Sequence, residues 1–182
     1  MLVPIKSFRL AKVRLASTLG PAERGDLARR MATRVIHAAG SLPVAVVCDD
    51  DDVAAFARDL GASVVWTPGL GLNGAVTAAV DELREQGALE VIVAHGDLPL
   101  ADDLRRLAGF AGATLVPDRR DDGTNVLVVP TGVGFTFAYG PGSFARHRHI
   151  ADQLALPYRV LRDPRLGWDV DEPADLDDLT WT

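Results

Sequence analysis

Short apolar runs alternate with amphipathic segments along most of the chain. The apolar runs are four to eight residues long and predict β-strands. Between them, apolar residues recur at helical spacing: Leu27, Met31 and Val35 fall on one face of a segment that has Pro21 near its start and Gly40 at its end. The predicted strands are 2–5, 43–48, 63–66, 90–97, 113–117, 125–130, 134–139 and 158–161, and the predicted helices are 21–40, 51–61, 73–87, 102–110, 142–155 and 173–179.

This alternation of strands and helices predicts an α/β fold with a mainly parallel sheet. Residues 125–130 and 134–139 are predicted as a pair of strands that adds an antiparallel part, so the sheet would be mixed. The body of the run 90–97 is continuously apolar, as expected for a strand covered on both faces. We therefore expect a three-layer α/β/α, Rossmann-like sandwich with its ligand beyond the carboxyl ends of the strands.

Length and composition predict one folded domain over residues 1–182, because this length buries one full core comfortably but not two. Hydrophobic residues make up 48% of the chain, yet no apolar run reaches the roughly 20 residues that cross a bilayer. The stretch "MLVPIKSFRL" lacks the apolar core and cleavage site of a signal peptide. The single cysteine, Cys48, excludes an internal disulfide, so we expect a cytoplasmic protein without a membrane partner.

The net charge is −6, but the charges are unevenly distributed. A negative chain is a poor general binder of nucleic acid, which normally requires a basic face. The first acid is Glu23, however, and the segment before it carries Lys6, Arg9, Lys12 and Arg14. Lys12 and Arg14 lie two positions apart, so an extended backbone would point both toward one side, where they suit a polyphosphate. The alternative is a solvated basic loop.

Two further loops that follow predicted strands carry candidate residues. Asn73, in the stretch "TPGLGLNGAV", is placed either to cap the next helix or to lie where glycines let the backbone approach a flat base. Asp97 ends the strand 90–97, where a carboxylate is either a metal or catalytic group or a helix cap. His95 precedes it and receives no role, because a lone histidine is more often structural.

A second group of polar residues follows residue 117. Thr124 and Asn125 add hydrogen-bonding groups to a turn between two predicted strands. Ser143 stands at the start of a predicted helix, with Arg146 and Arg148 after it. Backbone N–H groups at a helix start with arginines nearby favour a phosphate or carboxylate. A plain turn and a solvated basic helix face are the alternatives.

The stretch "WDVDEP" carries two aspartates at the spacing of an extended backbone. Asp169 and Asp171 are two positions apart, so both would lie on one face. Asp171 is also placed to cap the last predicted helix, and Glu172 and Asp175 are attributed to the negative start of that helix. Together with Asp97, the two aspartates would form an oxygen-only site suited to Mg²⁺, and no cluster of cysteine and histidine competes for a softer metal.

Six stretches occur in the order seen in one enzyme family. They are "VPIKSFRLAKVRL", "GLNGAV", "GDLP", "PDRRDDGTNVL", "YGPGSFARHR" and "WDVDEPADL", and they are spread over nearly the whole chain. The chain resembles the guanylyltransferases that build the precursor of coenzyme F-420, which are the 2-phospho-L-lactate and phosphoenolpyruvate guanylyltransferases. These belong to the nucleotidyltransferases of the glycosyltransferase-A type, so the resemblance implies a sheet of the nucleotide-diphospho-sugar transferase type.

The resemblance implies a role for each candidate. Bound GTP would contact Lys6, Lys12, Arg14, Leu72 and Asn73, with Lys12 and Arg14 at its phosphates and Leu72 and Asn73 at the guanine or ribose. The phosphorylated three-carbon acid would contact Thr124, Gly140, Ser143 and Arg146. Mg²⁺ would be held by Asp97, Asp169 and Asp171, and the catalytic residues would be Lys12, Arg14 and Asp97. Two acids in "DRRDDGTN" lie where the anion of the acceptor is expected, so the identity of the acceptor stays open.

The implied reaction suits these residues. An oxygen of the acceptor's phosphate would attack the α-phosphorus of GTP and pyrophosphate would leave, so positioning and charge neutralisation suffice without a general base. A molybdenum-cofactor guanylyltransferase is a second interpretation, although its glycine-rich loop after the first strand is missing here. A nucleotide-binding module without turnover is a third. Handover of the product to the next enzyme of the pathway and a homodimer are further hypotheses.

Overall fold

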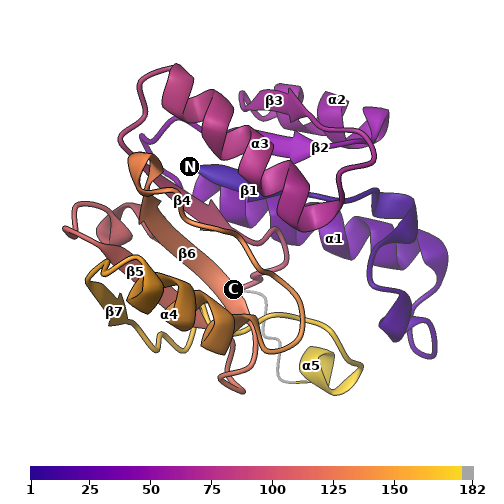
Figure 1. The fold of residues 1–182 in the computed structure, drawn as a ribbon. Coiled ribbons are helices and arrows are strands. Elements are labelled where there is room, and N and C mark those ends of the chain that lie inside the picture. The colour runs from indigo at the N-terminus through magenta and orange to yellow at the C-terminus, as the bar shows by residue number, and fades with distance from the viewer. Residues whose placement is uncertain (178–182) are drawn as a thin grey trace.

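One seven-stranded sheet forms the middle of the molecule (Figure 1). The computed structural model describes residues 1–177, and the strands lie in the order β3-β2-β1-β4-β6-β5-β7. The strands are β1 (Leu2–Pro4), β2 (Ala45–Cys48), β3 (Ser63–Trp66), β4 (Glu90–Ala94), β5 (Ala113–Pro117), β6 (Thr124–Pro130) and β7 (Tyr158–Val160). β6 runs antiparallel to both of its neighbours, whereas the other neighbouring pairs are parallel. The predicted mixed, mainly parallel sheet is confirmed.

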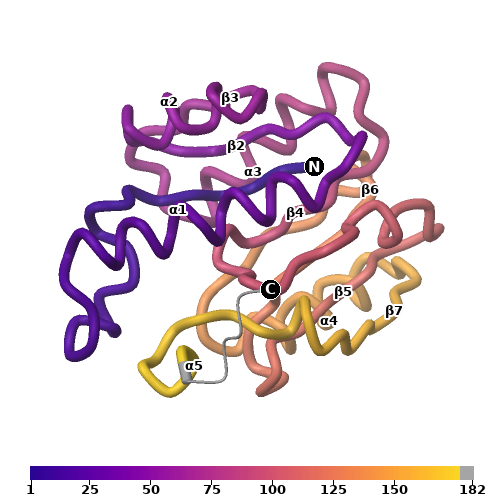
Figure 2. Tube along the Cα trace, turned by 180° about the vertical axis from the view of Figure 1, so that it is seen from behind, coloured from indigo at the N-terminus to yellow at the C-terminus, as the bar shows by residue number. Residues whose placement is uncertain are grey.

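Helices cover both faces of this sheet. The helices α1 (Pro21–His37) and α2 (Asp51–Asp59) pack on one face, and α3 (Gly71–Glu85) and α4 (Ser143–Gln153) pack on the other. Figure 2, seen from behind, shows α1 in front of the sheet. The short helices are η1 (Phe8–Leu10), η2 (Val13–Leu15), η3 (Leu104–Leu107), η4 (Thr131–Val133) and α5 (Ala174–Asp177). The three-layer prediction is confirmed, and within residues 1–177 no helix is long and apolar enough to cross a membrane.

The apolar side chains of β4 are buried on both faces of the sheet. Ile92 and Ala94 pack in the cluster that includes α1 and α2, and Val91 and Val93 pack in the cluster that includes α3 and α4. None of the four is more than 4% exposed. Because neither face meets water, the run needs no polar positions, and its continuous apolar sequence correctly predicted a doubly covered strand. Burial of this kind contributes about 1.5–3 kcal/mol for each large aliphatic side chain.

A smaller apolar cluster joins segments that are far apart in the sequence. Leu15 of η2 and Leu27 and Met31 of α1 pack against Val170. Val170 is fully buried, whereas the aspartates on either side of it are only partly buried. The packing of Val170 therefore anchors the C-terminal acidic segment, residues 169–172, against the N-terminal basic loop, residues 6–15.

Residues 134–139 do not form the strand predicted beside 125–130. Phe135, Phe137 and Tyr139 are buried and the residues between them are more exposed, so the alternation in the sequence is real. However, β6 already pairs with β4 along one edge and with β5 along the other, which leaves no edge for a further strand. The backbone N–H groups of residues 138 and 139 donate to side chains of α4 and α3 instead. The prediction was wrong because a period of two reports one-sided burial and not strand pairing.

The helix predicted at 102–110 is also shorter than expected. Only the 3-10 helix η3 forms there. The Asp103 side chain accepts a hydrogen bond from the backbone N–H of Arg105 at the start of this turn, and Gly109 adopts φ +81° just after it. A local side-chain bond and a left-handed glycine thus limit this segment to a single turn.

Other helix boundaries also differ from the sequence prediction by one to three residues. The helix predicted from Asn73 begins two residues earlier, at Gly71, so Asn73 lies within its first turn. The last helix, α5, begins at Ala174 and is described as far as Asp177. The rest of the predicted helix 173–179 lies outside the described residues.

Candidate active site

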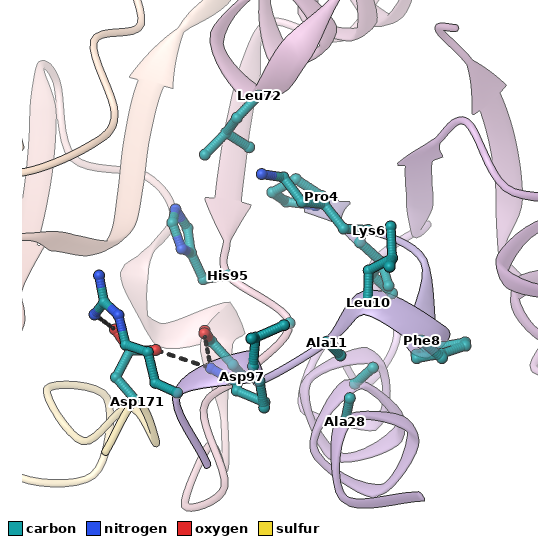
Figure 3. A pocket seen from close by; sticks show the side chains of 16 residues that line it. Pro4, Lys6, Phe8, Leu10, Ala11, Ala28, Leu72, His95, Asp97 and Asp171 are labelled. Carbon is teal, nitrogen blue, oxygen red and sulfur yellow. Dashed lines mark hydrogen bonds and ion pairs between the residues drawn. The ribbon is translucent and has the colours of Figure 1, made fainter. Parts of the chain in front are cut away.

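A cavity of about 410 Å³ opens beyond the carboxyl ends of β1 and β4 (Figure 3). Its wall combines the N-terminal basic loop, the start of α3, the residues that follow β4 and one residue of the C-terminal acidic segment. The predicted site residues that line it are Lys6, Lys12, Arg14, Leu72, Asp97 and Asp171. The cavity lies where open α/β sheets bind their ligands.

Lys12 is the central cation of this cavity. Its Nζ donates to Oδ2 of Asp97 at 2.6 Å and to Oδ1 of Asp171 at 3.1 Å, and its side chain is only 10% exposed. Burial alone would lower the pKa of Lys12, but the two carboxylates outweigh burial and raise it, so the ammonium stays charged. Arg14 joins the same group, because its Nη1 donates to Oδ2 of Asp171 at 3.3 Å.

The side chains of Lys12 and Arg14 both contact Asp171, but the backbone that brings them together is not the extended one that the sequence predicted. The backbone between them is not extended: Lys12 adopts a left-handed φ of +51° and η2 begins at the next residue. A lysine in this backbone region is uncommon and strained. The structure therefore brings the two cations together through a tight turn, and the argument from an extended backbone was wrong.

The three predicted metal ligands carry excess negative charge. Oδ1 of Asp97 is buried without a hydrogen-bond partner. Burial, and then the negative charges of Asp97 and Asp171, raise the pKa of Asp169 to about 6. A divalent cation relieves such charge, and carboxylate oxygens are the ligands that Mg²⁺ prefers, so the donor chemistry fits. Within residues 1–177, however, no three His, Cys, Asp or Glu side chains already form a metal-binding group, and the Mg²⁺ assignment stays a prediction.

Asn73 has its side chain engaged inside the protein. Its Oδ1 accepts from the backbone N–H of Tyr139 at 2.7 Å, and its Nδ2 donates to the carbonyl oxygen of Tyr139 at 3.3 Å. Asn73 therefore ties α3 to the segment 134–139 and does not cap the helix, whose N-cap position is Leu70. Leu72, and not the side chain of Asn73, lies on the cavity wall.

The predicted acceptor residues Thr124 and Ser143 lie together. Both are 2% exposed, and Oγ of Ser143 is 3.5 Å from Oγ1 of Thr124. His147 holds this pair: its Nε2 accepts from the backbone N–H of Ala138 at 2.9 Å, and its Nδ1 is 3.0 Å from Oγ1 of Thr124. Since Nε2 is the acceptor, the neutral ring carries its proton on Nδ1 and donates it to Thr124. Burial, with the nearby charge of Arg146, lowers the pKa of His147 to about 4.

Gly140 and Arg146 belong to the loop beside this pair. The carbonyl oxygen of Gly140 accepts from the backbone N–H of Ser143 at 3.0 Å, and Gly140 adopts φ +117°. The guanidinium of Arg146 donates to the carbonyl oxygens of Ala138, Gly140 and Pro141. Arg146 thus fixes the loop through its carbonyl groups, so its predicted contact with the acceptor's anion gains no direct support.

Aromatic rings in contact connect the Thr124–Ser143 pair, predicted to bind the acceptor, to the cavity. The ring of Tyr139 lies 4.9 Å from that of His147 on one side and 4.9 Å from that of His95 on the other, between centroids. His95 lines the cavity, and its Nε2 is buried without a partner. The sequence assigned His95 no role because a lone histidine is more often structural, and its ring contact with Tyr139 depends on the tertiary structure.

The three acids of "DRRDDGTN" are engaged in contacts within the protein. Asp121 pairs with Arg162 at 2.8 Å. Oδ1 of Asp122 accepts from the backbone N–H of Gly142 at 3.1 Å. Asp118, before them, accepts hydrogen bonds from three backbone N–H groups of the same turn. These acids shape the turn between β5 and β6, and Asp122 occupies the N–H group of Gly142 just before α4, where the sequence favoured an anion.

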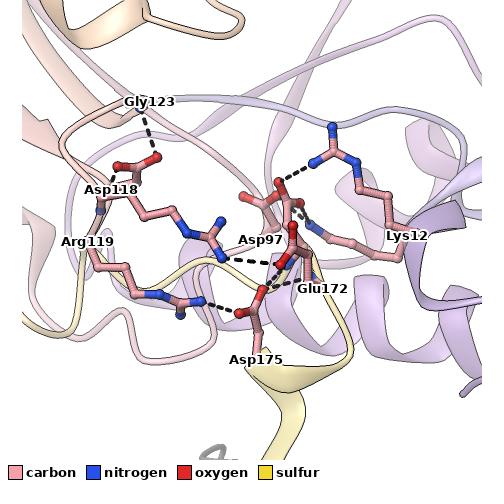
Figure 4. A network of polar contacts seen from close by, with 10 residues as sticks. Lys12, Asp97, Asp118, Arg119, Gly123, Glu172 and Asp175 are labelled. Atoms are coloured by element: carbon pink, nitrogen blue, oxygen red, sulfur yellow. Dashed lines mark hydrogen bonds and ion pairs between the residues drawn. The ribbon is translucent and has the colours of Figure 1, made fainter.

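Sequence reasoning also missed Arg119 and Asp175. Asp175 was attributed to the negative start of a helix, yet it is 2% exposed and pairs with Arg119 from the turn between β5 and β6 (Figure 4). No local pattern marks this pair, because the two residues are 56 positions apart. The one available signal was an acid in excess of what helix capping requires.

Comparison with known proteins decides the family. A family model described as "Guanylyl transferase CofC like" matches residues 1–181. The chain belongs to this family. Family membership identifies a nucleotidyltransferase and disfavours the molybdenum-cofactor and non-catalytic interpretations.

Two curated proteins and one solved structure are similar to this CofC-like chain. It is 36% identical to a phosphoenolpyruvate guanylyltransferase of Sphaerobacter thermophilus, over 97% of this chain and 90% of that protein. It is 28% identical to a 2-phospho-L-lactate guanylyltransferase of Methanocaldococcus fervens, over 98% of this chain and 83% of that protein. The crystal structure of a candidate nucleotide-diphospho-sugar transferase from Desulfovibrio desulfuricans G20 superimposes with a TM-score of 0.77 at 18% identity, over 97% of this chain and 83% of the other. This last likeness confirms the predicted type of fold.

Proposed function

We propose that this CofC-like chain transfers GMP from GTP to the phosphate of a phosphorylated three-carbon acid and releases pyrophosphate, in the biosynthesis of coenzyme F-420. One observation carries the proposal: Lys12 joins Asp97 and Asp171 at the carboxyl ends of β1 and β4, and Tyr139 and His95 link this group to the buried Thr124–Ser143 pair. The residues proposed to bind the nucleotide and those proposed to bind the acceptor thus lie on either side of the rings of His95 and Tyr139.

The cavity suits a nucleoside triphosphate. Its volume of about 410 Å³ lies within the range of small-ligand sites. Lys12 and Arg14 provide cations for the phosphates, and Leu72 provides an apolar contact for the base. We assign the metal to Asp97, Asp169 and Asp171, where Mg²⁺ would neutralise charge on the reacting phosphates.

The residues of the chain position the reactants and do not abstract a proton. A phosphate monoester is already ionised at neutral pH, so the acceptor needs no general base. This agrees with the histidines of the site, because burial lowers the pKa of both His95 and His147 and keeps them neutral. We assign the hydroxyl groups of Thr124 and Ser143, whose oxygens lie 3.5 Å apart, to hold the acceptor in line with the α-phosphorus.

Phosphoenolpyruvate is the first candidate for the acceptor. The relative named for phosphoenolpyruvate is 36% identical to this chain, against 28% for the relative named for 2-phospho-L-lactate. Cytoplasmic location, handover of the product to the next enzyme of the pathway and a homodimer belong to the same proposal. Co-purification tests the handover, and sedimentation tests the dimer.

The direct test is to incubate the protein with GTP, Mg²⁺ and either phosphoenolpyruvate or 2-phospho-L-lactate, and to follow pyrophosphate release. We expect release that depends on an acceptor and is fastest with phosphoenolpyruvate. Reactions without an acceptor, and reactions with ATP in place of GTP, are the controls. Absence of acceptor-dependent release with both acids would contradict the proposal.

A further inference from the structure

Asp175 is a buried carboxylate that reaches back to the acidic segment before its own helix. Its Oδ2 accepts from the backbone N–H groups of Asp171 and Glu172, at 2.7 Å each. Its Oδ1 pairs with the guanidinium of Arg119, as Figure 4 shows. Burial alone would raise the pKa of Asp175, but these hydrogen bonds and Arg119 outweigh burial and lower it, so the carboxylate is ionised. The backbone of Asp171 is therefore fixed by a charged group that is itself held in place.

Arg119 fastens the same segment at two further points. Its guanidinium carbon lies 4.2 Å from the ring centroid of Trp168. Its backbone N–H donates to the carbonyl oxygen of Gly167 at 2.9 Å. Arg119 thus contacts Gly167 and Trp168, which directly precede the predicted metal ligand Asp169. Through its pair with Asp175, it also supports the backbone of Asp171.

The turn between β5 and β6, which carries Arg119, also contacts residues 142–144 at the start of α4. Besides the bond from Gly142, Asp122 accepts with its carbonyl oxygen from the backbone N–H of Phe144 at 3.0 Å. The carboxylate of Asp118 accepts from the N–H groups of residues 120, 122 and 123 and so stiffens the turn. One stiff turn therefore touches the acidic segment on one side and the start of α4, with Ser143, on the other.

We infer that Arg119 and Asp175 are positioning residues that hold the carboxylate of Asp171 in register with the acceptor site. This inference rests on the proposed function, because it assumes that Asp171 is a metal ligand. Neither residue lines the 410 Å³ cavity, so both act through the segment they hold. Groups that orient metal ligands in this way typically change metal affinity or activity about 10- to 100-fold when they are removed.

The chain offers a matched pair of variants for the test. Arg119→Met removes the charge but keeps an unbranched side chain to cover Trp168. Arg120→Met makes the same change at the next position, where the pair with Glu172 is 3.4 Å long and both side chains are more than half exposed. Exposed pairs of this kind contribute little, so Arg120→Met controls for loss of charge from the turn.

Two readouts separate positioning from plain stability. The first is the dissociation constant for Mn²⁺ of the full-length protein, measured by calorimetry without substrates. The second is hydrogen–deuterium exchange of the amides in residues 166–172. For Arg119→Met we expect about 10- to 100-fold weaker Mn²⁺ binding and faster exchange of the Asp171 and Glu172 amides. For Arg120→Met we expect both values to stay close to wild type.

Asp175→Asn tests the pair from its other side if Arg119→Met fails to fold. Asn keeps the shape but removes the ionic partner of Arg119. The double variant should bind Mn²⁺ no more weakly than the weaker single variant, because both changes break one contact.

The inference would be overturned if Arg119→Met lowered the unfolding temperature while Mn²⁺ binding and amide exchange matched those of Arg120→Met. That result would assign the pair a purely structural role. If the wild-type protein bound no Mn²⁺, the proposed metal site would fail instead. The exchange data would then still decide whether the pair holds the segment.

Discussion

The ammonium of Lys12 lies 2.6 Å from the carboxylate of Asp97, although the two residues are 85 positions apart in the sequence. The second carboxylate at this ammonium, Asp171, comes from the other end of the chain, 159 positions away. The fold thus collects two acids and their shared cation from three separate segments. The ammonium of Lys12 is thus already charged and oriented at the position where a triphosphate and a metal are proposed to bind.

Lys12→Met should lower the rate of pyrophosphate release about 100-fold or more, because it removes a cation proposed to stabilise charge on the reacting phosphates. The measurement is kcat with saturating GTP and phosphoenolpyruvate. Arg84→Met is the control, because Arg84 is half exposed and pairs only with Asp81 of its own helix among the contacts described. Equal rates for Lys12→Met and wild type would contradict the assignment of Lys12.

Asp97→Asn and Asp169→Asn should each abolish turnover while the fold stays intact, as circular dichroism would show.

The two variants should differ in stability. Asp169 has a pKa raised to about 6, first by burial and then by its acidic neighbours, so its charge destabilises the metal-free fold at neutral pH. Asp169→Asn should therefore raise the free energy of unfolding by about 1–3 kcal/mol without Mg²⁺, after a discount for partial exposure. Asp97→Asn should give no such gain, because it removes the ionic partner of Lys12.

The stability of the protein should fall as the pH drops from about 6.5 to about 4, in part because of His147. The pKa of His147 in the folded protein is lowered to about 4, first by burial. The unfolded chain, with a pKa near 6.5, therefore binds the proton first. The contribution is fully present above pH 6.5 and is lost progressively down to about pH 4, with a size of up to about 3 kcal/mol. Protonation of Nε2 would also break the hydrogen bond from Ala138.

Urea unfolding at a series of pH values measures this loss. His147→Gln should flatten the curve between pH 6.5 and 4. His149→Gln is the matched control, because His149 is exposed on the same helix. A curve for His147→Gln with the same slope as wild type would show that His147 does not cause the pH dependence.

Asn73→Ala should destabilise the protein by about 1–3 kcal/mol, because it leaves the backbone N–H and carbonyl groups of Tyr139 without their partner. Denaturant unfolding measures the change. Thr77→Ala on the same helix is the control, because the hydroxyl of Thr77 only adds a bond to a carbonyl oxygen of its own helix. Since Tyr139 adjoins the Gly140 loop, the KM for the acceptor should rise more than the KM for GTP. Equal changes in both constants would argue against this link.

Local sequence patterns predicted the seven strands of the sheet and the main helices. These features depend on side chains within a few residues of one another, so their periods of about 2 and 3.6 are visible in the sequence. The loops after predicted strands supplied most candidate residues and the resemblance to a known family implied their roles, and the structure brings most of those proposed for the nucleotide and the metal to one cavity.

Only the tertiary structure decided which polar groups meet. Residues 134–139 have the period of a strand but no free sheet edge beside them, since β4 and β5 occupy both edges of β6. Arg119 and Asp175 look like ordinary surface charges until the turn between β5 and β6 is placed against the C-terminal segment. The side chain of Asn73 is hydrogen-bonded to the backbone of Tyr139, which lies 66 positions away in the sequence. The sequence determined which segments are buried, because burial follows from local composition, whereas the partners of buried charges and amides depend on the path of the whole chain.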